Sequence, residues 1–279
     1  MQKWNLIIDV AKCENCNCCF LATKDEHVGN DFPGYAAPQP LHGHAWIDIK
    51  RRVRGGGHMV EANYMPTTCN QCDNAPCLKA GNGAVSKRED GIVLIDPVKA
   101  KGRRDLVDAC PYGAIWWNEE LQIPQKGIFE AQLLDQGWTQ TRGAHACPTG
   151  AMITVKLGDD EMASRARDQE LRVLNPELGT KPRVWYRNLH LYDKCFVGGS
   201  VIAEIAGVTE CVEGAEVDLI KEGGVIASTR TDTYGDFKFD GLPPDSGAYS
   251  CRARHPSLGR AEAGATVGES TYIGQLRLG

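Results

Sequence analysis

Cysteine spacing constrains this chain more than any other feature of its sequence. Two short cysteine runs are each matched further along the chain by a lone cysteine followed by proline. The runs are Cys13-x2-Cys16-x2-Cys19 and Cys69-x2-Cys72-x4-Cys77. The lone cysteines open two similar hexapeptides, Cys110-Pro-Tyr-Gly-Ala-Ile and Cys147-Pro-Thr-Gly-Ala-Met. Because closely spaced thiolates converge on one centre, and the glycine lets the backbone approach it, the sequence predicts two centres with four ligands each.

Three thiolates from one run and a fourth from a distant Cys-Pro pair hold [4Fe–4S] clusters in bacterial ferredoxins. Eight cysteines suffice for two such clusters, so the chain is predicted to be an electron carrier. A nested pairing joins the first run to the second Cys-Pro pair and the second run to the first Cys-Pro pair. It gives these ligand sets: Cys13, Cys16, Cys19 and Cys147 for cluster 1, and Cys69, Cys72, Cys77 and Cys110 for cluster 2. The alternative is the reciprocal pairing of two-cluster ferredoxins.

A redox-silent zinc site with four cysteines is the other interpretation of such runs. Zinc ribbons usually supply ligands two and two, whereas here they come three and one, twice, which favours iron–sulfur clusters. Cys18 is a competing ligand beside Cys19, although the two-residue gap favours Cys19. The other cysteines are expected to pack as small buried apolar residues: Cys195, Cys211 and Cys251.

Bulk composition excludes several functions. The chain has 279 residues, is 42% hydrophobic and carries a net charge of −5, which fits a globular protein of two domains that does not bind nucleic acid. No apolar stretch approaches the ~20 residues of a spanning helix, so no direct membrane insertion is expected. Twelve cysteines without a secretory leader favour metal-bound thiolates and a cytoplasmic location. Export together with a partner that carries the signal is the alternative.

The chain is predicted to be α+β, with a ferredoxin-like iron–sulfur domain over residues 1–194 and an all-β sandwich over 195–279. Strands are expected at 4–10, 45–49 and 91–95 and after both Cys-Pro pairs, and helices at 97–108 and 159–174. Beyond residue 195, alternating apolar residues predict strands at 214–220, 225–231, 231–239, 248–254 and 271–278. This part resembles prealbumin-like and carboxypeptidase-regulatory-like modules in its Gly-Ala-x-Val and Thr-Asp-x-x-Gly-x-Phe patterns, which predicts a docking or covering role.

With these motifs, the chain resembles the iron–sulfur subunits that accompany molybdopterin enzymes of the dimethyl-sulfoxide-reductase family. It is most similar to the small subunits of pyrogallol–phloroglucinol transhydroxylases and resorcinol hydroxylases. The resemblance extends over nearly the whole chain, including the C-terminal module. Its matching stretches are Gly83-Ala84-Val85 and residues 88–97, 110–113 and 176–184.

The sequence departs from the broader family where further ligand cysteines are expected. Four such positions would serve one cluster: Thr23, Gly127, Glu130 and Gly143. Four others would serve a second cluster: Gly81, Ala100, Arg103 and Leu106. The absent cysteines thus make up the complete ligand sets of two clusters, and the other two sets are untouched. This pattern supports the nested pairing independently of the spacing. For the transhydroxylase branch the resemblance implies a third cluster at the first of these sites, and this chain lacks its ligands.

The resemblance implies a non-catalytic electron-transfer subunit of a heterodimer that acts on polyhydroxylated aromatics in anaerobic metabolism. The reaction would be pyrogallol/phloroglucinol-type transhydroxylation or resorcinol-type hydroxylation. A large partner subunit would hold molybdopterin with Mo or W and contain the active site, and no catalytic residue is assigned to this chain. The alternatives are an iron–sulfur subunit of a respiratory reductase or oxidase linked to a quinone pool, and a redox-inactive scaffold.

Overall fold

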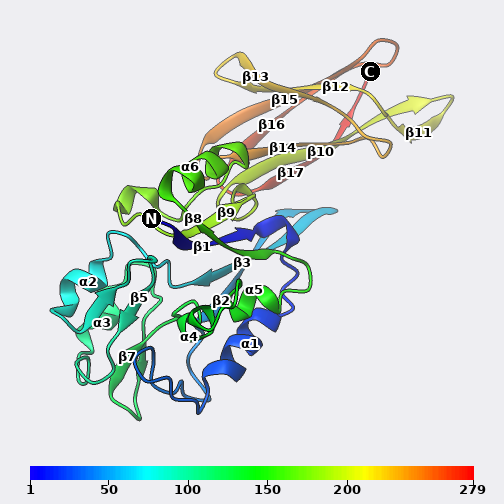
Figure 1. Ribbon diagram of the computed structural model, residues 1–279. Coiled ribbons are helices and arrows are strands. Elements are labelled where there is room, and N and C mark those ends of the chain that lie inside the picture. Colours follow the sequence, from blue (N-terminus) through cyan, green and yellow to red (C-terminus); the bar gives the residue numbers. More distant parts are fainter. The chain divides into compact units, whose positions relative to one another are not determined.

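The computed structural model describes residues 1–279, which divide into two compact units. Unit 1 comprises residues 1–50 and 64–189, and unit 2 comprises residues 51–63 and 190–279. Unit 1 contains all eight predicted ligand cysteines, together with short helices and strands, whereas unit 2 consists almost entirely of strands (Figure 1). The predicted order, an α+β part followed by an all-β part, is therefore confirmed.

A three-stranded sheet organises unit 1. Its central strand, β1 (Lys3–Asp9), pairs antiparallel with β8 (Met152–Leu157) and parallel with β9 (Val184–Arg187). Every residue of β1 after Lys3 is buried. The Asp9 carboxylate accepts a hydrogen bond from the backbone N–H of Ala11 and so caps η1 (Val10–Lys12). The first cysteine run therefore begins directly after a buried strand and its capped turn.

The remainder of unit 1 consists of hairpins and short helices. The hairpins are β2 (Ile47–Gly56) with β3 (Met59–Thr68), β4 (Val85–Lys87) with β5 (Val93–Ile95), and β6 (Trp116–Asn118) with β7 (Ile123–Gln125). The turn end of the first hairpin, residues 51–63, belongs to unit 2. The helices are α1 (Cys18–His27), α2 (Pro76–Gly81), α3 (Asp105–Asp108), α4 (Ala131–Asp135), α5 (Arg142–His145) and α6 (Asp159–Asp168), with the 3-10 turn η2 (Pro176–Leu178). The two Cys-Pro pairs lead into β6 and β8, as predicted.

The helix predicted over 97–108 is wrong except for its last turn, α3. The Asp96 carboxylate accepts hydrogen bonds from the backbone N–H groups of Val98 and Lys99, which closes a turn at this point. Gly102 then adopts a left-handed φ of +77°, a conformation that ends any helix. The helix predicted over 159–174 is confirmed as α6 but ends at Asp168.

Besides residues 51–63 of the first hairpin, unit 2 contains α7 (His190–Asp193) followed by two sheets. In one, β10 (Cys195–Ile205) pairs with β11 (Val208–Cys211), β14 (Asp236–Leu242) and β17 (Thr271–Arg277). The other has the order β13 (Gly224–Arg230), β12 (Glu216–Lys221), β15 (Gly247–His255), β16 (Gly259–Val267). Buried side chains of both sheets, such as Val197, Leu219 and Phe237, form one apolar core.

Three strands of unit 2 were not predicted from the sequence: β10, β11 and β16. The prediction that Cys195 and Cys251 pack as buried apolar residues is confirmed, since both are fully buried. The same prediction is wrong for Cys211, which is exposed. It ends β11, an edge strand whose residues all face solvent.

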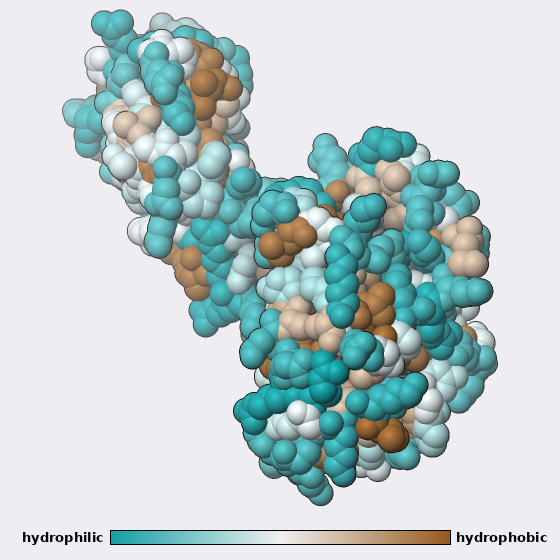
Figure 2. Space-filling view, turned by 90° about the vertical axis from the view of Figure 1, so that its left-hand side faces the viewer, coloured by the Kyte–Doolittle hydropathy of each residue, from teal (hydrophilic) through white to brown (hydrophobic).

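No helix of the structure is long and apolar enough to cross a membrane. On the face that Figure 2 shows, hydrophobic residues form separate small patches between hydrophilic ones.

Candidate metal centres

Four cysteines from three parts of unit 1 line one cavity: Cys69, Cys72, Cys77 and Cys110. The first two follow β3, the third lies in the first turn of α2, and the fourth follows α3. Gln71 has a left-handed φ of +46°, and Pro76 starts α2, so the chain turns sharply twice within this run. The structure thus brings together the second cysteine run and the first Cys-Pro pair.

Burial makes three thiols of this cavity weak acids: Cys72, Cys77 and Cys110. The pKa of Cys72 is raised to about 12 and that of Cys77 to about 11, mainly by burial and also by the neighbouring cysteine Cys69. None of the four forms a disulfide. Four sulfur donors in an apolar pocket are the ligand set that an iron–sulfur cluster requires, and a bound metal would hold them as thiolates. The residues present therefore fit a [4Fe–4S] cluster.

The second set of cysteines is also brought together, around the start of α1 and the end of α5. Charge interactions link Cys19 with Cys13, Cys16 and Cys147, although burial is the larger influence and raises the pKa of Cys19 to about 12. This site is nearer the surface than the first, because Cys16 is exposed while Cys19 is buried. Cys18 hydrogen-bonds with Cys16, which raises the pKa of Cys18. Cys19 is thus the cysteine of α1 that faces the protein interior.

Both Cys-Pro pairs form the same turn. Gly113 and Gly150 have left-handed φ values of +62° and +63°, and their N–H groups donate to the carbonyl oxygens of Cys110 and Cys147 over 3.1 and 3.3 Å. Further backbone N–H groups of each turn form hydrogen bonds with the cysteine sulfur. These are the N–H groups of Tyr112 and Ala114 for Cys110, and those of Thr149, Ala151 and Met152 for Cys147.

At the second turn, these hydrogen-bond donors affect the pKa of the cysteine more than burial does. Burial alone would raise the pKa of Cys147, but the Thr149 hydroxyl, 3.6 Å from the sulfur, and the backbone N–H groups lower it below its usual value. Hydrogen bonds of this kind favour the thiolate, which is the form that binds a metal. The turn therefore prepares Cys147 as a ligand.

Replacing Gly150 with alanine is expected to weaken the cluster held by Cys147. No atom lies within 4 Å of an added methyl group, so the cost comes from the left-handed backbone alone, about 1–2 kcal/mol. Relaxation of the turn would withdraw its N–H donors from sulfur and speed cluster loss. The loss of absorbance near 400 nm under an iron chelator measures that rate. Gly207→Ala is the control, since Gly207 has a φ of +84° in an open turn of unit 2. Equal rates for the two variants would contradict this expectation.

At two of the positions where ligand cysteines are absent, a glycine is closely packed by its neighbours. A side chain at Gly143 would place its Cβ 2.5 Å from Ile47 Cδ1, and one at Gly127 would lie 2.9 Å from Thr68 Oγ1. Gly127, Thr23 and Glu130 line one small cavity. In the other set, Ala100 and Leu106 are fully buried in an apolar core. Arg103 donates hydrogen bonds to the carbonyl oxygens of Ala80 and Gly81.

Glu130, a buried acid that lines the small cavity, lies beside the buried base His27. Glu130 is 3% exposed, and burial raises its pKa to about 7, with Glu26 raising it further and Arg142 lowering it. His27 is fully buried, neither ring nitrogen has a hydrogen-bond partner, and burial lowers its pKa to about 4. Its Nε2 lies 3.9 Å from Glu130 Oε1. Near pH 6 both groups are therefore neutral.

Glu130→Gln is expected to stabilise the protein increasingly as the pH rises from 5 to 8. The folded-state pKa of about 7 lies above the value of about 4.3 for an unfolded glutamate. The contribution of Glu130 to stability is therefore complete below about pH 4 and is lost as the pH rises through 7. The variant should gain about 3 kcal/mol on the native chain over this range. Anaerobic denaturant titrations at several pH values measure the difference, and a pH-independent difference would contradict this assignment.

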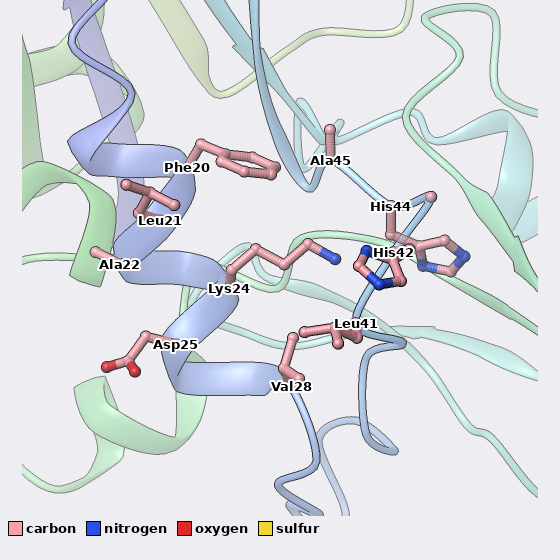
Figure 3. A pocket seen from close by; sticks show the side chains of 11 residues that line it. Phe20, Leu21, Ala22, Lys24, Asp25, Val28, Leu41, His42, His44 and Ala45 are labelled. Atoms are coloured by element: carbon pink, nitrogen blue, oxygen red, sulfur yellow. The ribbon is translucent and has the colours of Figure 1, made fainter.

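A hollow on unit 1 lies between α1 and the loop 41–45 (Figure 3). Lys24 extends from α1 into it, and its Nζ donates to the carbonyl oxygen of Pro40 over 2.8 Å. His44 Nε2 lies 2.9 Å from the carbonyl oxygen of Trp117. Burial lowers the pKa of both Lys24 and His44. The polar groups of the hollow thus hold the loop in place and form no nucleophile–base pair.

Two family models match the chain. Residues 60–157 match the 4Fe-4S dicluster domain, and residues 197–276 match the carboxypeptidase regulatory-like domain. The first match includes the second cysteine run and both Cys-Pro pairs, and the second covers most of the strands of unit 2. The predicted fold class, a ferredoxin-like iron–sulfur domain followed by a prealbumin-like β domain, is therefore confirmed.

Named relatives extend this result. The chain is 46% identical to the pyrogallol hydroxytransferase small subunit of Pelobacter acidigallici, over 90% of each chain. It is 31% identical to a tetrathionate reductase subunit of Salmonella typhimurium, over 70% of this chain and 75% of the relative. It is 35% identical to the arsenate respiratory reductase iron–sulfur subunit of a Shewanella species, over 66% of this chain and 96% of the relative.

These matches define an iron–sulfur electron-transfer protein of the kind that forms the small subunit of a multi-subunit enzyme. The chain belongs to the family of iron–sulfur subunits of molybdoenzymes, as the resemblance in its sequence predicts. Membership implies a large catalytic partner.

Proposed function

We propose that this chain is the electron-transfer subunit of a heterodimeric molybdopterin oxidoreductase that acts on polyhydroxylated aromatics. The reaction is transhydroxylation of the pyrogallol/phloroglucinol type or hydroxylation of the resorcinol type. The observation that carries this proposal is the 46% identity to a pyrogallol hydroxytransferase small subunit over 90% of both chains. Molybdopterin with Mo or W and the active site lie in the large subunit, and this chain contributes no catalytic residue.

The proposal includes two [4Fe–4S] clusters, each of which takes up and releases one electron when bound. Their ligands are Cys13, Cys16, Cys19 and Cys147 for cluster 1, and Cys69, Cys72, Cys77 and Cys110 for cluster 2. The shared cavity of the second set and the matching turns at both Cys-Pro pairs support this assignment. The iron–sulfur domain spans residues 1–194 and the β-sandwich domain 195–279. Metal-bound thiolates suit a reducing compartment, which supports a cytoplasmic location.

The test is to purify the chain with its partner anaerobically and to assay conversion of pyrogallol with and without an electron acceptor. Transhydroxylation needs no net acceptor, so conversion in its absence would support that version. Strict dependence on an acceptor would contradict transhydroxylation and favour hydroxylation. A complex with full cofactor content that converts no polyhydroxylated benzene would overturn the proposal.

A respiratory reductase subunit is the second candidate, because the tetrathionate and arsenate reductase relatives share 31% and 35% identity with this chain. Co-purification with a quinone-reactive membrane anchor, and oxidation of the clusters by tetrathionate or arsenate, would favour this candidate over the first.

A further inference from the structure

A lysine lies in the wall of the cavity formed by Cys69, Cys72, Cys77 and Cys110. Lys126, the residue after β7, is 2% exposed and lines the same cavity as the four cysteines. Its Nζ donates hydrogen bonds to the carbonyl oxygens of Val93 and Gly127, the second over 3.2 Å. Neither partner is a carboxylate. The structure therefore buries a cation whose hydrogen bonds go to neutral carbonyl groups.

Burying an ammonium without an opposite charge is costly, typically by several kcal/mol. The groups in the cavity that can supply negative charge are the cysteine sulfurs. Lys126 and all four cysteines line this cavity, and no residue that lines it carries a carboxylate. The counter-charge of Lys126 is thus the thiolate set, together with whatever those thiolates bind.

The lysine is held rigidly in this position. Gln71, which lies between Cys69 and Cys72, is fully buried. Its side-chain amide donates to the Gly127 carbonyl over 2.9 Å, and its oxygen accepts from the Val93 N–H over 2.8 Å. Gln71 therefore connects the two residues whose carbonyl groups receive the ammonium. A fixed positive charge, unlike a mobile one, acts on the cavity in every redox state.

We propose that Lys126 raises the reduction potential of the cluster bound by Cys69, Cys72, Cys77 and Cys110, and so sets the direction of electron flow between the two clusters. This inference rests on the ligand assignment in the proposed function. Reduction adds one negative charge to a cluster, and a positive charge nearby stabilises that state in a poorly screened interior. At the other site the residue that directly follows Cys13 is an anion, Glu14.

The test is an anaerobic redox titration of the complex with its partner, followed by electron paramagnetic resonance. Lys126→Gln and Lys126→Met remove the charge, and Lys126→Arg retains it. Lys99→Gln is the control, because the Lys99 side chain is 66% exposed and its charge is screened by water. A Cys110→Ser chain identifies which of the two signals belongs to the cluster beside Lys126.

In the neutral variants, the ratio of reduced to oxidised cluster at the native midpoint should fall at least tenfold. That fall corresponds to about 59 mV in a one-electron couple. The other cluster, and both clusters in the arginine and control chains, should keep their potentials. Unchanged potentials at full iron content would overturn the tuning role and leave the proposed function intact. Loss of one cluster from all three Lys126 variants would also overturn it, because the lysine would then be needed to form the site.

Discussion

The double variant Cys77→Ser/Cys110→Ser is expected to retain about four iron atoms per chain, half of the native content of about eight. Both cysteines line the same cavity, so both changes should remove the same cluster. Reciprocal pairing predicts a different result, because the two residues would then belong to different clusters and nearly all iron would be lost. Iron and acid-labile sulfide assays after anaerobic purification distinguish the two pairings.

The matched experiment uses the other site. Cys19→Ser/Cys147→Ser should also leave about four iron atoms, and the surviving electron paramagnetic resonance signal should differ from that of the first double variant. Cys211→Ser is the control, because this thiol is exposed on the edge strand β11 of unit 2. Loss of iron from the control chain would mean that the assays report general instability and not ligation.

Arg183→Met is expected to lower the free energy of unfolding by about 3 kcal/mol. The Arg183 guanidinium is 4% exposed and donates to both carboxylate oxygens of Asp73, to Asp159 over 2.8 Å and to Asn5 over 3.3 Å. Burial alone would raise the pKa of Asp73, but its hydrogen bonds with Arg183 and Lys87 lower it. Removing the arginine leaves a half-buried carboxylate with only the two lysines Lys87, at 3.0 Å, and Lys3, at 3.7 Å, to neutralise it.

The same variant should also loosen the cluster site, because Asp73 directly follows Cys72 and the Arg183 N–H donates to the carbonyl oxygen of Asn70. Faster iron loss to a chelator and an earlier denaturant midpoint are the two measurements. Arg230→Met is the control, since the pair of Arg230 with Glu216 is exposed and worth less than about 1 kcal/mol. Equal destabilisation of the two variants would contradict the role of Arg183.

The sequence predicted the cysteine sets because ligand spacing is a local signal. Runs with two residues between cysteines, and the Cys-Pro turn with its glycine, are fixed within a few residues of the chain. The second predicted set lines one cavity, and the two Cys-Pro turns lead into the strands β6 and β8, while ligation itself stays a prediction. Resemblance, and not spacing, singled out Thr23, Gly127 and Glu130, which line one cavity.

What escaped prediction depends on distant contacts. Lys126 has no local feature that distinguishes it from a surface lysine, and only the folded chain shows that it is buried beside four cysteines. The neutral pair of His27 and Glu130 joins residues about a hundred positions apart. β10 was missed because it is buried on both faces along most of its length, so its sequence does not alternate. Most of the helix expected over 97–108 is absent, because the chain forms turns at Asp96 and Gly102 instead.

Iron, acid-labile sulfide and zinc per chain, determined after anaerobic purification, test the central claim most directly. Two [4Fe–4S] clusters predict about eight iron and about eight sulfide with little zinc. About twelve of each would mean a third cluster with other ligands, which would contradict the account of the absent cysteines. Zinc without sulfide would contradict the electron-transfer function itself, because a zinc site is redox-silent.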